Sequence, residues 1–274
     1  MSLIPNVLTI AGSDSSGGAG VQADLKTFGA LGVYGMSVIT ALTAQNTVGV
    51  RSVVSVPARF VRDQIDAVFD DVDVSAVKIG MLASADIINA VADSLEEYKP
   101  DYVVFDPVMV STSGDVLIDI AAIDAMKNRL FPLVNLITPN IPEAEKLLRK
   151  AVLDMEVAAQ GLCDMGVRGA LLKGGHLKGD VMRDVLVHDG VVKAYEAPRV
   201  VTRNTHGTGC TLSSAIAAYL AHGLSVDDAC GRAKTYLTGA LKSADMLNVG
   251  SDDVLGHGPV HHFHAYQNVS KVAE

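Results

Sequence analysis

Apolar and polar residues follow one another along the chain in two alternating patterns. Short apolar runs rich in β-branched residues, such as residues 6–11 and 76–79, are separated by longer segments in which apolar residues return every three or four positions. The first pattern is typical of strands buried in a parallel sheet, and the second of amphipathic helices. Their alternation predicts an α/β fold whose central sheet is mostly parallel and flanked by helices.

The two patterns divide the chain into the following expected elements. Strands are predicted at residues 6–11, 35–42, 50–56, 76–79, 102–105, 133–138 and 169–173, and helices at 21–31, 58–71, 84–98, 119–130, 141–148, 153–165, 210–223 and 226–244. Two more apolar runs, 184–188 and 191–197, flank Asp189-Gly190, a dipeptide typical of a β-hairpin turn. No repeat, low-complexity block or linker divides the chain, so we expect one domain.

Composition narrows the classes of function. The chain has 274 residues, of which 49% are hydrophobic, and this is enough for a large core. Its net charge of -9 argues against general binding to nucleic acid or to anionic membranes. Three scattered cysteines form no disulfide framework or metal-binding pair, and no secretory signal or apolar stretch of membrane-spanning length is evident. We therefore expect a cytoplasmic protein.

The most informative stretch is residues 204–211, which read Asn-Thr-His-Gly-Thr-Gly-Cys-Thr and lead into the predicted helix 210–223. Gly207 and Gly209 can expose successive backbone N–H groups, and a helix N-terminus adds the positive end of its dipole. Together these features predict an anion-binding loop like those that hold phosphates. Cys210 lies in this field, where its thiolate would be favoured, so it is a candidate base or nucleophile. The alternative is a buried, inert cysteine.

A second glycine-rich stretch, residues 12–20, separates the first strand from the first helix. Gly12 and Gly17 have the spacing of a Walker A loop, yet Gly18 stands where that motif has its lysine, and the Gly-x-Gly-x-x-Gly dinucleotide pattern is absent too. Two interpretations stay open. The loop either lets a ligand approach the backbone closely or is a flexible connection.

Several polar side chains come soon after predicted strands. Gln45 follows one strand, and Asp106, Glu143 and Lys173 follow three later ones. In a parallel sheet these carboxyl ends share one edge, where ligands bind. A glutamine amide can read the edge of a heterocycle, two carboxylates suit Mg²⁺, and a lysine offsets phosphate charge. Each residue alone is also typical of an ordinary solvated loop, but their placement beside an anion loop favours phosphoryl transfer.

The tail, residues 256–264, is dense in histidine. Zinc accepts imidazole ligands, but the spacing of these histidines matches no standard metal-binding pair. We therefore expect the tail to have a positional role.

These stretches resemble the motifs of the bacterial hydroxymethylpyrimidine/phosphomethylpyrimidine kinases of thiamine biosynthesis, in the ribokinase superfamily. The resemblance runs nearly end to end and rests on residues 11–24, 40–46, 78–82, 106–109, 138–144, 204–211 and 258–264. It implies one ribokinase-like kinase domain over residues 1–274, a transferase that uses ATP with Mg²⁺, and a homodimer. The implied reaction converts 4-amino-5-hydroxymethyl-2-methylpyrimidine to its monophosphate and then to its diphosphate.

Position within these motifs implies a role for each candidate residue. The anion hole would be formed by Gly207, Thr208 and Gly209, and Cys210, where many relatives have Asp, would be the base on the substrate hydroxyl. The pyrimidine would be recognised by Gln45, in a pocket lined by Gly12, Asp24, Met81 and Val108. Lys173 would contact the ATP phosphates, and Asp106 and Glu143 would hold Mg²⁺.

Three alternatives remain open from the sequence. Some pyridoxal kinases resemble this family and share Gly-Thr-Gly-Cys, so phosphorylation of pyridoxal or pyridoxine is the second reading. Cys210 could instead be the nucleophile of a Cys-His hydrolase, with His206 or His176 as its base. A noncatalytic pyrimidine sensor would bind the heterocycle without turnover.

Overall fold

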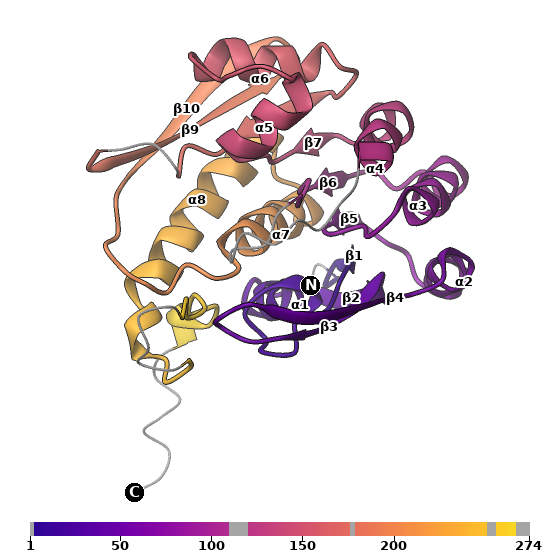
Figure 1. Ribbon diagram of the computed structural model, residues 1–274, viewed down its shortest axis with the longest axis horizontal. Helices are drawn as coiled ribbons and strands as arrows, with labels where there is room; N and C mark the ends of the chain where they lie inside the picture. The colour runs from indigo at the N-terminus through magenta and orange to yellow at the C-terminus, as the bar shows by residue number, and fades with distance from the viewer. Residues whose placement is uncertain (1–2, 110–119, 176–178, 251–255, 267–274) are drawn as a thin grey trace, which may run out of the picture.

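The computed structural model describes residues 3–109, 120–175, 179–250 and 256–266. Within these residues the chain forms an eight-stranded sheet in the order β10-β9-β8-β7-β6-β5-β1-β2 (Figure 1). The strands from β2 to β8 in that order pair in parallel, whereas β9 and β10 are antiparallel to their neighbours. The bounds are β1 Asn6–Ala11, β2 Tyr34–Ile39, β5 Ala76–Ile79, β6 Val103–Phe105, β7 Leu136–Ile137, β8 Gly169–Leu172, β9 Val181–His188 and β10 Val191–Pro198.

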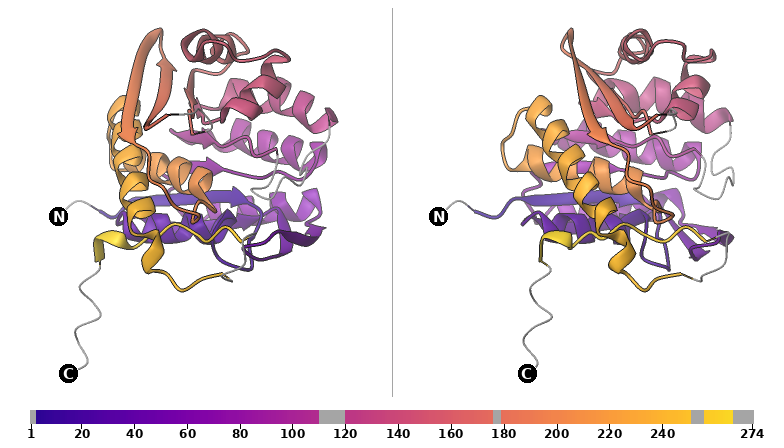
Figure 2. Two further views of the ribbon diagram at one scale, coloured as in Figure 1. Left: turned by 60° about the vertical axis from the view of Figure 1, so that its left-hand side comes forward. Right: turned by 90° about the vertical axis from the view of Figure 1, so that its left-hand side faces the viewer.

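Helices cover both faces of this sheet (Figures 1 and 2). One layer consists of α1 (Gly20–Ala30), α7 (Thr208–Ala221) and α8 (Val226–Lys242), and the other of α2 (Ala58–Phe69), α3 (Ala85–Tyr98), α4 (Ile120–Ala125), α5 (Ile141–Leu148) and α6 (Met155–Cys163). Three short helices complete the described chain: η1 (Met126–Leu130), η2 (Phe131–Leu133) and η3 (Ala244–Met246). Each layer buries its own apolar cluster against the sheet. The predicted α/β fold is confirmed.

Helix starts follow local capping signals. Ser84 accepts a hydrogen bond from the backbone N–H of Ile87 at the start of α3. Asn140 and Glu143 form a reciprocal capping box at the start of α5. Such caps satisfy N–H groups that have no partner inside the helix. The second cap also fixes the carboxylate of Glu143 close to the end of β7.

The predicted strand 35–42 is wrong in one respect, because the chain leaves the sheet within it. β2 ends at Ile39, and Thr40 turns the chain by donating its N–H to Ala11 O and its hydroxyl to Met81 O. The chain then forms β3 (Ala41–Gln45), which pairs only with β4 (Val50–Ser55) in a separate antiparallel sheet. No glycine or proline marks this turn, so the apolar pattern could not reveal it.

Other boundaries differ by smaller amounts. The helix predicted at 119–130 is described from Ile120 and becomes a π-helix at η1, while position 119 lies outside the described residues. β7 has two residues where six were expected. α7 begins at Thr208, two residues earlier than predicted, because Gly207 adopts a left-handed conformation and caps it. The glycine motif is therefore the first turn of the helix itself.

The hairpin prediction is confirmed. β9 and β10 pair in antiparallel register across Asp189 and Gly190, whose φ angles of 48° and 77° are those of a type I′ turn. No helix in the described part of the chain is both long and apolar enough to span a membrane. The cytoplasmic location stays a prediction.

Candidate active site

A cavity of about 630 Å³ opens at the carboxyl edge of the parallel strands. Its wall includes Gly12 after β1, Met81 after β5, Asp106 after β6 and Lys173 after β8. The start of α7 forms another part of the wall. The expected convergence of these residues at one edge of the sheet is thus what the structure shows.

The first turn of α7 is open to an anion. Gly207, Thr208, Gly209 and Cys210 all line the cavity. A Cβ on Gly207 would lie 1.8 Å from the carbonyl oxygen of Gly18, and its φ of 77° also requires glycine. α7 has no acidic residue in its first turn and no side-chain cap. The N–H of Thr208 donates to Thr205 O at 3.3 Å, and the positive end of the α7 dipole lies at the cavity wall beside the carboxylate of Asp106.

A lysine and a carboxylate pack directly against this turn. Lys173 Nζ lies 2.8 Å from Asp106 Oδ1, which also accepts a hydrogen bond from Thr138 Oγ1 at 3.0 Å. A Cβ on Gly209 would lie 3.0 Å from Asp106 Oδ2 and 3.3 Å from Lys173 Nζ. Glycine at this position therefore lets a cation and an anion approach the backbone of the anion loop closely.

Glu143 supplies the second carboxylate. Its side chain is buried, and Oε2 accepts the N–H of Asn140 at 2.7 Å. Burial raises the pKa of Glu143 to about 7; the Asp106 charge adds to the rise, and Lys173 opposes it. A carboxyl group in this condition is stabilised in its ionised form by a nearby cation.

Asp106 and Glu143 fit a Mg²⁺ ion. This ion binds one or two protein carboxylates and completes its shell with water and phosphate oxygens. Within the described residues, no group of three His, Cys, Asp or Glu side chains could hold a metal alone. The pair would therefore hold the ion together with a phosphate-bearing ligand.

Cys210 has a different protonation state from the one expected. Burial raises the pKa of its thiol to about 11, although the Lys78 charge and a backbone N–H from Gly20 lower it. The expectation that the helix N-terminus would favour the thiolate is wrong for the free site, because desolvation outweighs these effects. The resting side chain is a thiol.

Asp24 does not line the cavity, contrary to expectation. It is fully buried and accepts hydrogen bonds from Thr9, Ser214 and Lys78, with both oxygens 2.8 Å from Lys78 Nζ. Lys78 forms part of the cavity floor. The role of Asp24 is therefore to hold a buried ammonium group beneath Cys210, since a buried charge requires a partner.

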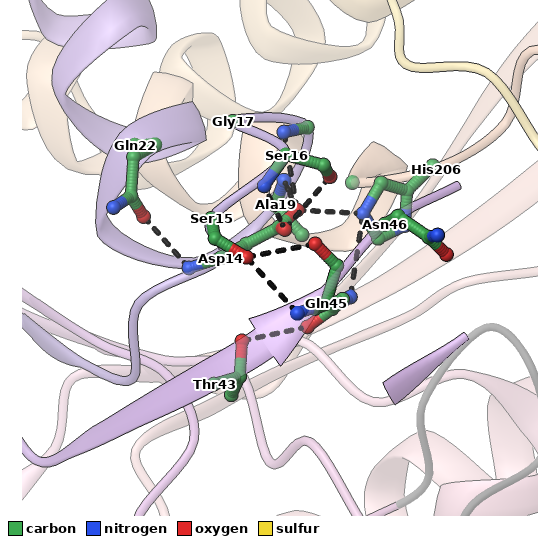
Figure 3. A network of polar contacts seen from close by, with 12 residues as sticks. Asp14, Ser15, Ser16, Gly17, Ala19, Gln22, Thr43, Gln45, Asn46 and His206 are labelled. Atoms are coloured by element: carbon green, nitrogen blue, oxygen red, sulfur yellow. Dashed lines mark hydrogen bonds and ion pairs between the residues drawn. The ribbon is translucent and has the colours of Figure 1, made fainter. Parts of the chain in front are cut away.

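The loop 12–20 is folded around the side chain of Asp14 (Figure 3). Asp14 Oδ1 accepts bonds from the N–H and hydroxyl of Ser16, and Oδ2 accepts the N–H groups of Gly18 and Ala19. The Nε2 atom of His206 lies 2.7 Å from the same Oδ2. Burial raises the pKa of Asp14, but the hydrogen bonds and the charge of His206 outweigh this and lower it to about 2. The loop is thus ordered, and the hypothesis of a flexible connection is wrong.

The remaining predicted residues lie at the β3 end of the cavity. Gln45, Gly12, Met81 and Val108 all line it. The backbone of Gln45 is fixed by Ser15, whose hydroxyl donates to Gln45 O and accepts from Gln45 N. Residues from the glycine loop and from β3 therefore enclose one lobe of the cavity.

Another part of the cavity wall, called here the α8 lobe, is formed by α8, by the last residue of β10 and by the segment that follows it. Its apolar and polar lining includes Pro198, Val200, Leu237, Thr238 and Leu241. An apolar lobe with a few polar groups is suited to a flat ring system.

The C-terminal segment supports α7. Gly258 O accepts the N–H of His206, and His262 Nε2 lies 3.1 Å from the hydroxyl of Thr211. Burial lowers the pKa of His262 to about 3, so this imidazole is neutral. The contacts agree with the expected positional role of the tail.

Several cavity residues had not been assigned a role from the sequence. Lys78 could have been found, because a lysine inside the apolar strand 76–79 must have a buried partner. Asp14 had only the signal of an acidic residue in a glycine-rich loop. His206, considered as a hydrolase base, instead contacts Asp14, and His176 lies outside the described residues.

Comparisons with known proteins agree on one enzyme class. Residues 14–261 match the family described as phosphomethylpyrimidine kinase. The chain is 52% identical over 267 residues to a bifunctional thiamine biosynthesis protein of Geobacter sulfurreducens; the match covers 96% of this chain and 53% of that protein. It is 51% identical over 265 residues to the hydroxymethylpyrimidine/phosphomethylpyrimidine kinase of Escherichia coli, covering 95% of this chain and 98% of the relative.

The solved structures extend the likeness to a second activity. Pyridoxal kinase of Bacillus subtilis, crystallised as an ADP complex, is 35% identical and has a TM-score of 0.87. The match covers 97% of this chain and 100% of that one. The fold and the nucleotide-binding class of this neighbour agree with a cavity that has an anion-binding turn at its centre.

Proposed function

The chain belongs to the phosphomethylpyrimidine kinase family of phosphotransferases, and we propose that it phosphorylates 4-amino-5-hydroxymethyl-2-methylpyrimidine with ATP, first to the monophosphate and then to the diphosphate. The names of its relatives support a place in thiamine biosynthesis. One observation carries the proposal. A single cavity contains the amide of Gln45 at one end and, next to it, the anion-binding turn of α7 with Lys173.

The nucleotide would lie in the α8 lobe and reach the sheet edge with its phosphates. Lys173 Nζ, which contacts Asp106, would move partly away from it and neutralise phosphate oxygens. Asp106 and Glu143 would hold Mg²⁺. When bound there, Mg²⁺ would supply positive charge that offsets the negative charge developing on the phosphate oxygens. The N–H groups of the α7 turn would stabilise the transferred group, which is where such fixed donors contribute most.

The acceptor would lie in the lobe of Gln45, with its hydroxymethyl group directed at the α7 turn. Cys210 would take the proton of this hydroxyl as the oxygen bonds to the γ-phosphorus and the β–γ bridging bond breaks. Because the free thiol has its pKa raised to about 11, the active thiolate form increases as the pH rises. The monophosphate needs less help, since a phosphate monoester with a second pKa of about 6 is already ionised.

A substrate panel tests the proposal. The chain would be incubated with ATP and Mg²⁺ and one of three acceptors: hydroxymethylpyrimidine, its monophosphate or pyridoxal. We expect ATP-dependent formation of the monophosphate and diphosphate from the first two. Absence of both products from folded protein would overturn the proposal.

Pyridoxal phosphorylation is the second candidate. The favouring observation is the likeness to the pyridoxal kinase of Bacillus subtilis. The higher identity to the Escherichia coli kinase ranks it below the pyrimidine. Product formation with pyridoxal at the higher kcat/KM of the panel would reverse this order.

We also propose a homodimer that pairs through β3 and β4. This hairpin is isolated from the main sheet and exposes Leu42, Val53 and Val54, which are 50%, 45% and 65% accessible. A two-stranded sheet is marginally stable alone, and an exposed apolar strand pair is a typical contact between subunits. Light scattering should give twice the mass of 28.7 kDa, and Val54→Lys should shift it towards the monomer. A monomeric wild-type chain would contradict this assignment.

A further inference from the structure

The side-chain amide of Gln45 lies between the side chains of Thr43 and His206, which together determine its orientation (Figure 3). As drawn, Oε1 lies 3.3 Å from Thr43 Oγ1, and Nε2 lies 3.5 Å from His206 Nε2. The two ends of an amide have the same shape but opposite hydrogen-bonding character. Which end faces which neighbour is therefore decided by what each neighbour can donate or accept.

Thr43 can only accept a hydrogen bond from Gln45. A threonine hydroxyl has one proton, and the backbone carbonyl of Ser13 takes it at 2.8 Å. That carbonyl has no proton of its own to give. The lone pairs of Thr43 Oγ1 thus remain for Gln45, and they suit an amide N–H.

His206 can only donate from the atom nearest Gln45. Its Nε2 lies 2.7 Å from Asp14 Oδ2, and this carboxylate already accepts from Gly18 and Ala19. An ionised carboxylate is an acceptor, so the proton of this contact must be on Nε2 of the imidazole. The single proton of Nε2 is donated to Asp14, so this nitrogen has no lone pair that could accept an amide N–H of Gln45, and the positive N–H edge of the ring favours the amide oxygen.

Only one amide orientation satisfies both neighbours. With Oε1 towards His206 and Nε2 towards Thr43, an amide N–H donates to the hydroxyl oxygen of Thr43, and the amide oxygen faces the positive N–H edge of the imidazole. The exchanged orientation faces donor to donor and acceptor to acceptor, and buried contacts of that kind are costly. We propose that Thr43 and His206 are specificity-determining residues, which lock the Gln45 amide in this orientation and so fix the order of donor and acceptor that a ligand meets.

The lock has a chemical consequence that rests on the proposed function. A 4-aminopyrimidine presents a ring nitrogen that accepts beside an amino group that donates. Its 4-oxo counterpart presents a ring N–H that donates beside an oxygen that accepts. A glutamine that is free to rotate its amide by half a turn can serve both edges, whereas a locked one serves a single edge.

Binding of the two heterocycles tests the lock without relying on catalysis. Calorimetric titration would compare hydroxymethylpyrimidine with the compound in which oxygen replaces the 4-amino group. We expect the wild type to prefer the amino compound by roughly 10²-fold, the scale of two mismatched hydrogen bonds. His206→Leu and Thr43→Val should each reduce this preference by about tenfold or more, because one of the two restraints of this scale is removed.

Matched variants separate the lock from a general disturbance of the site. His206→Gln keeps an N–H near the position of Nε2, and Thr43→Ser keeps the hydroxyl. Both should retain the wild-type preference within about threefold, a difference under 1 kcal/mol. Since His206 is buried next to the anion loop, a poorly folded His206→Leu would leave Thr43→Val to decide the question.

The outcomes are distinguishable. Loss of preference in the Leu and Val variants with its retention in the Gln and Ser variants supports the lock. An unchanged preference in Thr43→Val, or equal affinity of the wild type for both heterocycles, overturns it while leaving pyrimidine phosphorylation intact. If the wild type phosphorylates neither hydroxymethylpyrimidine nor its monophosphate, the proposed function fails and the inference fails with it.

Discussion

Two glycine-rich loops meet at the centre of this protein, and they treat negative charge in opposite ways. Loop 12–20 wraps its N–H groups around the carboxylate of its own Asp14 (Figure 3). The turn at 207–210 begins α7 with no acidic side chain of its own in the first turn, and its residues line the cavity. The first loop contains its anion, whereas the second is open to an external one.

The difference teaches that glycine content alone does not identify a phosphate-binding loop. Both stretches have glycines that adopt positive φ, such as Gly17 and Gly207, and both precede a helix. What distinguishes them is whether a carboxylate of the loop itself accepts hydrogen bonds from the N–H groups, as Asp14 does in the first loop. The loops also touch, because a Cβ on Gly207 would meet the carbonyl of Gly18. Loop 12–20, which encloses the Asp14 carboxylate, thus packs against and supports the turn at 207–210.

The largest effect should come from emptying the first loop. Asp14→Ala leaves the N–H groups of Gly18 and Ala19 and the imidazole of His206 without their shared acceptor. We expect the free energy of unfolding to fall by about 3–5 kcal/mol, the scale for removing one member of a buried charge pair. Urea denaturation with the tyrosine signal or circular dichroism measures this loss.

Anion rescue makes this test specific. Formate should stabilise Asp14→Ala more than the wild type, because it can occupy the emptied loop. Asp93→Ala is the matched control, since that carboxylate is exposed on α3 and paired with Arg129, and it should change stability by less than about 1 kcal/mol. A loss in Asp14→Ala that formate leaves unchanged would show that the loop is not an anion cradle.

Cys210→Ala tests the open loop next. The first phosphorylation should slow by about 10²-fold or more, the usual scale for a lost general base, and the second considerably less. In the wild type the first step should accelerate with pH up to the thiol pKa of about 11, since the deprotonated thiol is the base. Single-turnover rates on the two acceptors across pH provide the comparison. Equal losses for both steps would remove Cys210 from the role of alcohol-selective base.

Gly209→Ala adds a methyl group to the turn at 207–210 but no charged group. The added methyl group would lie 3.0 Å from Asp106 Oδ2 and 3.3 Å from Lys173 Nζ, so the pair must shift. We expect turnover to fall by roughly 10- to 100-fold, since misplacement of catalytic groups has effects of this size. Stability should change little, because alanine also favours the helix. Gly29→Ala is the control: its methyl group would meet nothing within 4 Å, and activity should be kept.

Glu143→Gln should change the stability of the protein by an amount that depends on pH. The folded pKa of about 7 exceeds the ordinary glutamate value of 4.5, so between these two pH values the folded state holds a proton that the unfolded state has lost. The bound proton of Glu143 therefore contributes fully to the free energy of unfolding below about pH 4.5. This contribution is lost as the pH rises towards 7. Relative to Glu143→Gln, the wild type should lose about 3 kcal/mol of unfolding free energy across this window.

Denaturation midpoints of the two proteins at pH 5 and pH 8 measure the change. Glutamine can keep the capping bond to Asn140, so the comparison isolates the proton. If the unfolding free energies of the two proteins change with pH in parallel, the pKa of Glu143 is not raised. Added Mg²⁺ with ATP should shrink the difference, because a cation favours the ionised carboxylate.

The sequence predicts the sheet, most helices and the glycine turn at the start of α7 well, because periodic apolar patterns and glycine before a helix are local signals. The break at Thr40 was missed, since it depends on bonds to Ala11 and Met81 from distant segments. The burial of Asp24 and the protonated state of Cys210 were missed for a related reason. Both depend on how much water the completed fold excludes, which no short stretch of sequence records.

Amide NMR of the nucleotide complexes tests the contrast between the two loops most directly. Spectra with ADP and Mg²⁺ would be compared with spectra of the nonhydrolysable ATP analogue AMP-PCP and Mg²⁺, so that the difference isolates the γ-phosphate. The N–H resonances of Gly209 and Cys210 should move between the two complexes, and those of Gly18 and Ala19 should stay in place. Movement of Gly18 and Ala19 with Gly209 and Cys210 unchanged would contradict the assignment of the α7 turn as the site of the transferred phosphate.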